Sequence, residues 1–401
     1  MQNFQKTLLV CWFGVFTTSM GLSQIAPILP TYIQKLGNIP QDKLSFYVGL
    51  SFGITPIAMA IFSPLWAFLG SRFGYKKMLL RASLGMSILT LCLSFAHSVF
   101  DIVLIRAITG VISGFNSAAI VFIATISPKQ KVAYALGILS TGSISGSLIG
   151  PLFGGLVAEF LGIQAVFEFI AILIGCSFFT ILIFIKNDRP KISNSFAISK
   201  CEAKNDKKLI FTLFITTFII QFGTFGAIPM MGVFVQQIHQ GSHLIFWSGI
   251  VIAASGISDI IFSPKIGKIA DKIGPNKVIF VALIFCGICF YLQSIASNIF
   301  ALIFIRFLIG MGFGGLLPCV NALLKKEISP QKLSVIFGFN QTCQYLGNFA
   351  GSFGGGFIAS KTSMVFLFST ICALFISCAI LFALLRRKYI FDLSFFNFKE
   401  K

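Results

Sequence analysis

The sequence predicts an all-α membrane protein whose twelve transmembrane helices form two six-helix, pseudo-symmetric halves. The 401-residue chain is 56% hydrophobic and only 11% charged, which is far from the composition of a water-soluble domain. Apolar stretches of about 20 residues, long enough to cross a bilayer, recur along the chain. The two halves also match each other at an offset of 200 to 202 residues. The expected solvent of this chain is therefore a lipid bilayer.

The apolar stretches define where the helices are expected. The first stretch is too long for a cleavable signal peptide and lacks a small-residue cleavage site, so it is assigned as the first span. The twelve expected spans cover residues 8–33, 44–69, 78–96, 99–125, 132–158, 164–185, 209–235, 244–267, 277–297, 299–324, 333–359 and 363–385.

The basic residues indicate the orientation of these spans. The net charge of +19 would suggest a nucleic-acid partner in a soluble protein. Of the 31 Lys and Arg, however, only Lys35, Lys43 and Lys361 fall in predicted outer loops, and Arg106 and Arg306 fall within spans. The rest lie in inner segments if both termini are cytoplasmic, as the positive-inside rule requires. No nucleic-acid partner is expected.

The internal repeat defines the domain organisation. The expected parts are an N-terminal six-helix half (1–185), a polar and basic cytoplasmic linker (186–208) and a C-terminal six-helix half with a short cytoplasmic tail (209–401). An even number of spans places both halves in the membrane the same way round, and the interface between them is the expected substrate path. The matched residues include Pro27 with Pro229, Gly74 with Gly274, Arg106 with Arg306 and Gly146 with Gly347.

The loop between the second and third spans carries Arg72, Gly74 and Lys76. The glycine permits a tight turn between two helices, and the cations hold the loop on the cytoplasmic side while reaching carbonyls at helix C-termini. The second half repeats this loop with Gly274 and with an acidic residue, Asp271, where the first half has Ser71. A stronger inner gate is therefore expected in the second half.

The fourth span places Arg106, Gly110 and Gly114 on one helix face. A charge in hydrocarbon costs a few kcal/mol unless it faces a cavity or a partner, so Arg106 is expected either in a salt bridge or in proton or substrate coupling.

The fifth span contains Gly146, Gly150, Pro151, Gly154 and Gly155. Glycines at four-residue spacing clear a face for close helix packing, and the proline kinks the helix.

These motifs resemble those of the major facilitator superfamily, in particular its twelve-helix drug:proton antiporter branch of bacterial multidrug and tetracycline-type exporters. The loop of Arg72, Gly74 and Lys76 is similar to the family's inner gate motif, and Gly150-Pro151 followed by Gly154-Gly155 is similar to its antiporter motif. The resemblance implies a secondary transporter of the bacterial inner membrane that exports drugs or other small amphipathic compounds by alternating access, in exchange for protons. Export of one metabolite such as a siderophore, or proton-coupled nutrient uptake, is the alternative.

Proton coupling requires a titratable group within the membrane. Of the twelve acidic residues, only Glu168 and Asp259 lie well inside expected spans. Glu168 is about 6 Å from the outer end of its span, at a depth comparable to that of Arg106, so the two are expected to be able to pair. Asp259 lies deeper, and its repeat counterpart is Met59. Each acid is assigned either to coupling or to an interhelical hydrogen bond.

Uncharged polar residues at helix depth are candidates for the substrate cavity, with interhelical hydrogen bonding as the simpler explanation. The candidates are Gln24, Asn116, Gln221, Asn340 and Gln344.

The remaining chemistry excludes other protein classes. Nine of the ten cysteines fall in expected spans, and the three histidines fall in or next to outer loops, where they are expected to be solvated. The sequence has no ATP-binding loop, no metal-ligand cluster and no nucleophile paired with a base, so neither an enzyme nor a cofactor or metal is expected. A small-molecule substrate, protons and the lipid bilayer are the expected partners, and a monomer is expected.

Overall fold

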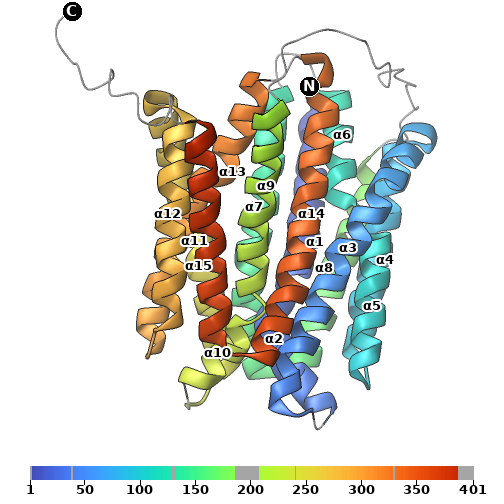
Figure 1. The fold of residues 1–401 in the computed structure, drawn as a ribbon. Coiled ribbons are helices and arrows are strands. Elements are labelled where there is room, and N and C mark those ends of the chain that lie inside the picture. The colour runs from blue at the N-terminus through green and yellow to red at the C-terminus, as the bar shows by residue number, and fades with distance from the viewer. Residues whose placement is uncertain are drawn as a thin grey trace, which may run out of the picture. The chain divides into compact units, whose positions relative to one another are not determined.

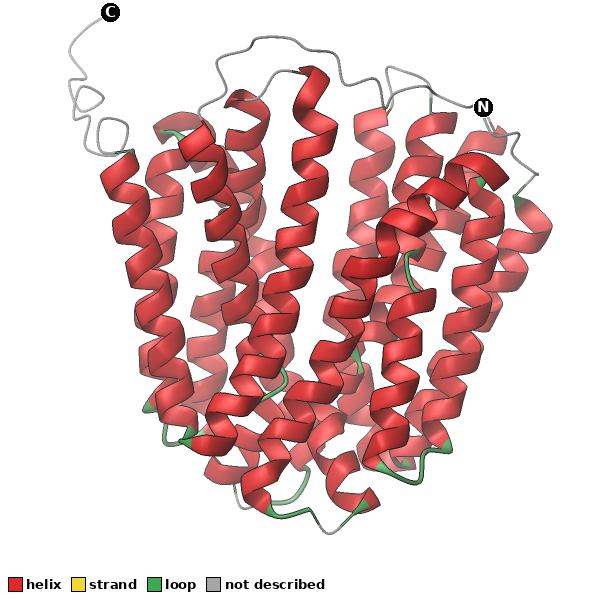
Figure 2. Ribbon diagram, turned by 45° about the vertical axis from the view of Figure 1, so that its right-hand side comes forward, coloured by secondary structure: helices red, strands yellow, loops and turns green. Residues whose placement is uncertain are grey.

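The computed structural model describes residues 2–37, 39–127, 132–185, 207–239, 241–327 and 330–386. These residues form helices joined by short loops, with no strand among them (Figure 2). The all-α prediction is therefore confirmed. The predicted linker lies outside the described residues up to residue 206.

The helices follow the predicted spans closely (Figure 1). They are α1 (Gln2–Ser23), α2 (Ile25–Leu36), α3 (Gln41–Phe73), α4 (Tyr75–Ser94), α5 (Val99–Ile112), α6 (Phe115–Ile126), α7 (Val132–Leu161), α8 (Ile163–Phe184), α9 (Lys207–Ala227), α10 (Met231–Ile238), α11 (Leu244–Ile273), α12 (Pro275–Ser294), α13 (Ile299–Glu327), α14 (Pro330–Lys361) and α15 (Met364–Leu385).

Eleven helical segments of the described chain are long and apolar enough to cross a membrane. The eleventh predicted span, 333–359, coincides with α14, which is 32 residues long but is not among these segments. The helix carries Asn340, Gln341, Gln344 and Asn348, and these amides lower its mean hydropathy.

The first and seventh predicted spans are each broken near a proline. Pro27 cannot donate a backbone hydrogen bond to the carbonyl of Ser23, and the chain leaves the helix between α1 and α2. Pro229 has the same effect between α9 and α10, where it leaves the carbonyl of Phe225 without its helical donor. The hydroxyl of Ser352 donates to that carbonyl at 3.2 Å. Both halves are therefore broken near the matched proline, although Pro27 lies inside α2 and Pro229 lies between α9 and α10.

The fourth span is broken in the first half only. Ser113 and Gly114 separate α5 from α6, and Gly114 has φ of 117°, a conformation that favours glycine. The corresponding span of the second half, α13, runs without a break through Gly314.

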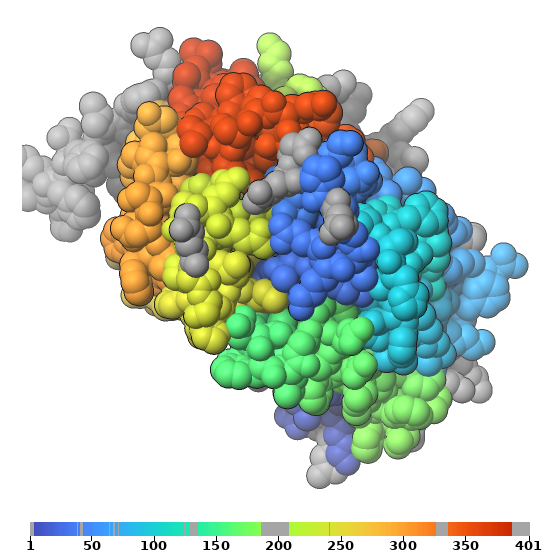
Figure 3. Space-filling model, turned by 90° about the horizontal axis from the view of Figure 1, so that it is seen from below, coloured from blue at the N-terminus to red at the C-terminus, as the bar shows by residue number. Residues whose placement is uncertain are grey.

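The chain divides into two compact units, residues 1–195 with 228–253 and residues 196–227 with 254–401. The first unit thus includes α10 and the start of α11, which the sequence assigns to the second half. Close approaches of two glycines explain this grouping. A methyl group added to Gly232 would lie 2.7 Å from Cγ of Pro30, and one added to Gly249 would lie 2.6 Å from the carbonyl oxygen of Pro151. Figure 3 shows the yellow surface of this segment against blue and green surfaces of the first unit.

Each unit has its own apolar core. In the first unit Cys11, Leu79, Phe115 and Ile181 are fully buried where α1, α4, α6 and α8 meet. In the second unit the rings of Phe290, Phe313 and Phe375 cluster, with the centroids of Phe290 and Phe375 5.4 Å apart. These cores hold the helices that position the candidate site residues.

Candidate functional site

The glycines of the fifth span pack α7 directly against the backbone of α1. A methyl group added to Gly146 would lie 3.0 Å from the amide nitrogen of Met20, and one added to Gly150 would lie 2.8 Å from the Met20 carbonyl oxygen. One added to Gly154 would lie 2.5 Å from the carbonyl oxygen of Gln24. These distances are shorter than ordinary contacts, so only glycine fits at this approach.

The second unit repeats this packing between α14 and α9. A methyl group added to Gly347 would lie 2.6 Å from the Phe218 carbonyl oxygen, and one added to Gly355 would lie 2.9 Å from that of Gly226. The shared glycines therefore join two helices in each unit.

Pro151 and Gly155 face a different neighbour of α7. A methyl group added to Gly155 would lie 3.0 Å from the carbonyl oxygen of Ile245 at the start of α11. The repeat counterpart of Pro151 is Ser352, whose hydroxyl bonds within its own unit. This contact with α11 distinguishes the first-unit motif from its second-unit counterpart.

The inner loop motif has the same backbone geometry in both copies. Gly74 has φ of 97° and ψ of 143°, and Gly274 has φ of 93° and ψ of 140°. Lys76 is buried, and its Nζ donates to the carbonyl oxygen of Leu182 at 3.2 Å, in the last turn of α8. The prediction that a loop cation reaches a helix C-terminus is confirmed for this residue. Arg72 and Asp271 are exposed.

Arg106 is buried on α5 and is held by α3. Its Nε donates to the carbonyl oxygen of Ser51 at 2.5 Å, its Nη2 lies 3.5 Å from that of Phe52, and its guanidinium lies over the Phe52 ring. The hydroxyl of Thr55 in turn donates to the Arg106 carbonyl oxygen. The burial of this cation is therefore compensated by carbonyl dipoles and an aromatic face.

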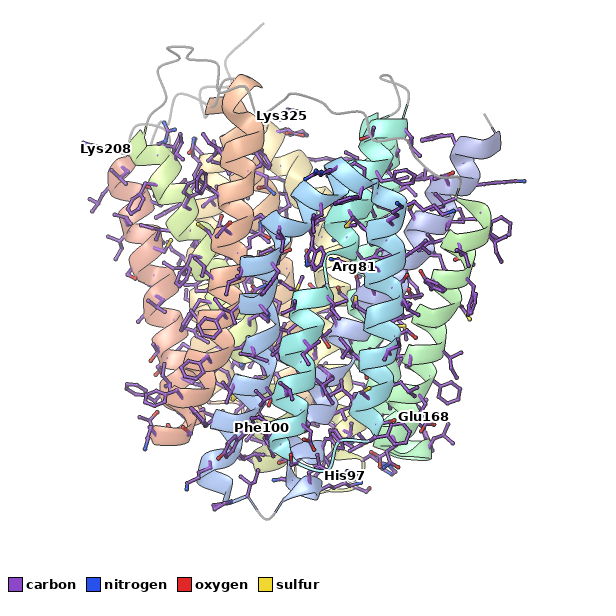
Figure 4. All side chains as sticks on the ribbon, turned by 90° about the vertical axis from the view of Figure 1, so that its right-hand side faces the viewer. Arg81, His97, Phe100, Glu168, Lys208 and Lys325 are labelled. Carbon is purple, nitrogen blue, oxygen red and sulfur yellow. The ribbon has the colours of Figure 1, made fainter. Side chains whose placement is uncertain are left out.

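Glu168 does not contribute to this arrangement. It is exposed on α8, five residues after the helix begins. Figure 4 places it toward the same end of the first unit as His97 and Phe100. The expected pair with Arg106 is not formed, since the hydrogen bonds of Arg106 go to α3.

Asp259 lies at the middle of α11, about 21 to 23 Å along the helix from either end. It is half-buried, and its Oδ1 would be 3.1 Å from a methyl group added to Gly314 of α13. No hydrogen bond or ion pair is found for this carboxylate among the described residues. The glycine leaves space in which the carboxylate can lie at membrane depth.

The polar candidates divide by burial. Gln24 is 1% exposed at the break between α1 and α2, and its Oε1 has no hydrogen-bond partner among the described residues. Asn116 is exposed near the start of α6. In the second unit Asn340 is 1% exposed, whereas Gln221 and Gln344 are half-buried, with Nε2 of Gln221 3.5 Å from Oε1 of Gln344.

Arg81 is one of the basic residues expected in inner segments, and the structure places it inside α4 beside the broken fourth span (Figure 4). Its Nη2 donates to the carbonyl oxygens of Ile112 and Ser113 at 3.0 and 3.1 Å. Its guanidinium stacks 3.4 Å above the ring of Trp66, whose Nε1 donates to the Val111 carbonyl oxygen. Arg81 and Trp66 thus satisfy the carbonyl groups exposed by the break. The repeat counterparts of Arg81 and Trp66 are Val281 and Ile266. This difference between the halves is the one feature of the sequence that could have indicated a special role for the pair.

A second missed contact lies at the other end of the first unit. Nδ1 of His243 is 2.8 Å from a carboxylate oxygen of Glu159, at the end of α7. His243 precedes α11 and has φ of 65°, which is unusual for a residue with a side chain. His243 is exposed in a loop, as expected of a solvated histidine, and its contact with Glu159 is an additional feature. No local sequence pattern indicates this contact, because Glu159 and His243 are 84 residues apart in sequence.

Known proteins match this chain over most of its length. The model of the Major Facilitator Superfamily matches residues 11–212 and again residues 213–400. The multi-drug resistance efflux pump PmrA of Streptococcus pneumoniae serotype 4 is 34% identical over 378 residues, covering 93% of this chain and 94% of that protein. The multidrug resistance protein MdtG of Proteus mirabilis is 36% identical over 366 residues, 90% of each chain.

Solved structures share the fold at low identity. The POT family transporter PepTSo matches with a TM-score of 0.77 and 13% identity, covering 96% of this chain and 98% of that one. A bacterial homologue of the human lysosomal transporter Spinster matches with a TM-score of 0.73 and 14% identity, covering 96% of each.

Proposed function

Because this chain belongs to the major facilitator superfamily, a family of transporters and not of enzymes, we propose that it exports drugs and other small amphipathic compounds in exchange for protons. The names of the related pumps, a multi-drug efflux pump and a multidrug resistance protein, support export. The family and the bacterial relatives make it a multi-pass inner-membrane protein. The alternative of single-metabolite export or nutrient uptake is not favoured.

The observation that carries proton coupling is the position of Asp259. A carboxylate at the middle of a membrane helix is unfavourable unless it is neutralised, paired or wetted. The carboxylate lies against Gly314, and no ion pair is found for it in the described part of the chain. Proton binding from the outer side would neutralise it, and proton release to the inner side would restore its charge. This change of charge is the step to which substrate movement is coupled.

Arg106 and Glu168 are secondary candidates for coupling. The carbonyl partners of Arg106 on α3 favour a role in which it joins α3 to α5 and responds to the charge of a substrate. The exposure of Glu168 near one end of α8 favours a boundary role. Both roles are proposals. We also propose that Arg72 and Lys76 serve the inner gate motif of the first unit and Asp271 that of the second. Asn116 is proposed as a substrate contact, whereas the 1% exposure of Gln24 favours a structural role at the helix break.

The positions of two lysines and the two matches to the family model support a topology and an assembly. We place both termini in the cytoplasm, because Lys208 and Lys325 lie at the same end of the second unit, as the positive-inside rule expects of inner segments (Figure 4). We also propose the predicted six-helix halves as the repeating elements, since the family model matches the chain twice. The transporter is proposed to act as a monomer.

Reconstituted protein tests this function directly. Proteoliposomes with an imposed pH gradient are expected to move a labelled drug against its gradient, and a protonophore is expected to abolish the movement. Asp259→Asn is expected to lose gradient-driven transport while retaining substrate exchange at equal pH, because exchange requires no proton release. Asp259→Glu is the matched control, since it preserves a titratable carboxylate, and it is expected to retain part of the gradient-driven transport.

The comparison with Glu168→Gln separates the two acids. If gradient-driven transport by Asp259→Asn equals that of the native protein and Glu168→Gln is inactive, Glu168 is the coupling residue. If neither variant changes the pH dependence, the carboxylate mechanism is wrong. Everted vesicles give the direction, because an exporter accumulates the drug inside them.

A further inference from the structure

Where α9, α13 and α14 of the second unit meet, two layers of uncharged polar side chains lie between the helices. The first layer consists of Thr217, Asn321 and Asn340, and the second is the glutamine triad, which we define as Gln221, Gln341 and Gln344. Thr217 and Asn340 lie about 15 Å from the first residues of their helices, and the triad lies about 17 to 21 Å from them. Both layers are therefore well inside the predicted membrane region.

The first layer is a structural clamp. The hydroxyl of Thr217 donates to Oδ1 of Asn340 at 2.8 Å, and Nδ2 of Asn340 donates to Oδ1 of Asn321 at 3.2 Å. These bonds have ordinary lengths and connect α9, α14 and α13. Asn340 is also 1% exposed, so little of its amide is available to a ligand. Interhelical hydrogen bonding explains this layer fully.

The glutamine triad does not have the geometry of such a clamp. Nε2 of Gln221 and Nε2 of Gln341 both lie 3.5 Å from Oε1 of Gln344, at the long limit of a hydrogen bond. Gln341 is exposed, and the other two are half-buried. An amide has two donor hydrogens and an acceptor oxygen with two lone pairs, so the described residues leave most of the bonding capacity of the triad unused.

An exposed amide at this depth indicates a water-filled space and not lipid. Polar side chains in membrane helices face the protein interior or an aqueous cavity, because hydrocarbon offers them no hydrogen bonds. The rings of Phe218 and Phe222 stack beside Gln221 on the same helix, with their centroids 6.4 Å apart. An amphipathic molecule would find aromatic surface and amide groups next to each other here.

The repeat shows that the triad is not part of the inherited scaffold. The counterparts of Thr217 and Asn340 in the first unit are Val15 and Leu139, which are buried apolar residues. The counterparts of Gln221 and Gln344 are Ser19 and Ser143, whose hydroxyls lie 3.2 Å apart. Helix packing at this position therefore needs only small groups, and the longer amides are an addition in the second unit.

We propose that the glutamine triad binds the uncharged hydrogen-bonding part of the substrate, such as an amide, ketone or hydroxyl group. The preferred substrates are accordingly neutral amphipathic compounds and not permanent organic cations, since the triad and the clamp contain no carboxylate. This inference rests on the proposed export function and specifies which compounds that function favours.

The test compares two probes on purified, reconstituted protein. Chloramphenicol is neutral and carries an amide and hydroxyl groups, whereas ethidium is a permanent cation. Gln344→Leu keeps the approximate size of the side chain and removes its hydrogen bonds. It is expected to weaken chloramphenicol binding by about three- to tenfold, the usual effect of losing one neutral hydrogen bond, and to leave ethidium binding unchanged. Gln344→Glu introduces a carboxylate and is expected to shift the preference toward ethidium.

Ser143→Ala at the equivalent position of the first unit is the matched control, and it is expected to leave the ratio of the two affinities unchanged. Equal weakening of both probes by Gln344→Leu, or an unchanged ratio in Gln344→Glu, would overturn the inference, provided that both variants elute as the native protein does in size-exclusion chromatography. If both variants misfold, the same comparison is made with Gln341→Leu and Gln341→Glu, whose site is exposed.

The binding measurement separates this inference from the proposed function. Native protein that binds chloramphenicol through the triad but shows no protonophore-sensitive transport would contradict proton-coupled export and support the binding site. Native protein that exports ethidium but does not bind chloramphenicol would support export and contradict the inference.

Discussion

Alanine substitutions in the glycine rows test whether these residues serve packing or transport. Gly146 on α7 and Gly347 on α14 are repeat counterparts, and both face the backbone of a neighbouring helix. Gly137 and Gly338 lie nine residues earlier on the same two helices, and a methyl group added to either meets nothing within 4 Å. The chain therefore offers two tight sites and two open sites in matched positions.

The magnitude follows from the added methyl group. At Gly347 it would lie 2.6 Å from the Phe218 carbonyl oxygen, whereas an ordinary contact begins near 3.4 Å, so the helices must separate by roughly 0.8 Å. Overpacking of this kind costs about 1–3 kcal/mol, while replacing glycine by alanine in a helix gains up to about 1 kcal/mol. The gain from alanine applies at all four sites and cancels in the comparison, so the tight variants are expected to be about 1–3 kcal/mol less stable than the open ones.

The assay is the apparent thermal midpoint of each variant in detergent, recorded at one heating rate because unfolding is expected to be irreversible. Gly146→Ala and Gly347→Ala are expected to unfold several degrees below Gly137→Ala and Gly338→Ala. Equal midpoints for the tight and open sites would refute the packing argument. Loss of transport in Gly146→Ala at an unchanged midpoint, with Gly347→Ala active, would show instead that the first-unit motif acts in transport.

Three further outcomes are expected. Arg81→Lys removes the paired contacts with the Ile112 and Ser113 carbonyls, so amide hydrogen exchange across the break is expected to accelerate, with Arg72→Lys as an exposed control. Asn340→Leu is expected to lower the thermal midpoint, because it removes both hydrogen bonds of the clamp, and a midpoint equal to that of the native protein would contradict the clamp. The contact between His243 and Glu159, whose side chains are 54% and 20% exposed, is expected to contribute no more than about 1 kcal/mol. His243→Ala is therefore expected to lower the thermal midpoint only slightly, and a fall as large as that of Gly347→Ala would contradict this estimate.

Much of the fold follows from local features of the sequence. Hydropathy located the spans, and the prolines at positions 27 and 229 mark helix breaks because a missing backbone donor acts within one turn. The contact of Lys76 with Leu182 could be anticipated because a cation in a cytoplasmic loop has few other acceptors than helix ends.

The remaining features depend on residues far apart in sequence. Gly114 and Gly314 occupy equivalent positions, yet only the first lies at a helix break, because the aromatic and cationic partners of that break lie on α3 and α4. The expected partner of Arg106 was a carboxylate, and the structure supplies backbone carbonyls, which are not distinguished by residue type. Asn340 is buried and Gln344 is half-buried, which gives them different roles. The sequence alone shows only that both are polar residues of one helix.

The partners of the broken fourth span also bear on how the protein is made. The exposed carbonyls of Val111, Ile112 and Ser113 cannot remain unsatisfied in hydrocarbon, where each would cost several kcal/mol. Their donors, Trp66 and Arg81, both precede them in the chain. During synthesis the second and third spans therefore emerge before the break does. We expect the fourth span to enter the bilayer together with the third, as a hairpin. Chains that begin after Arg81 are expected to insert the fourth span poorly.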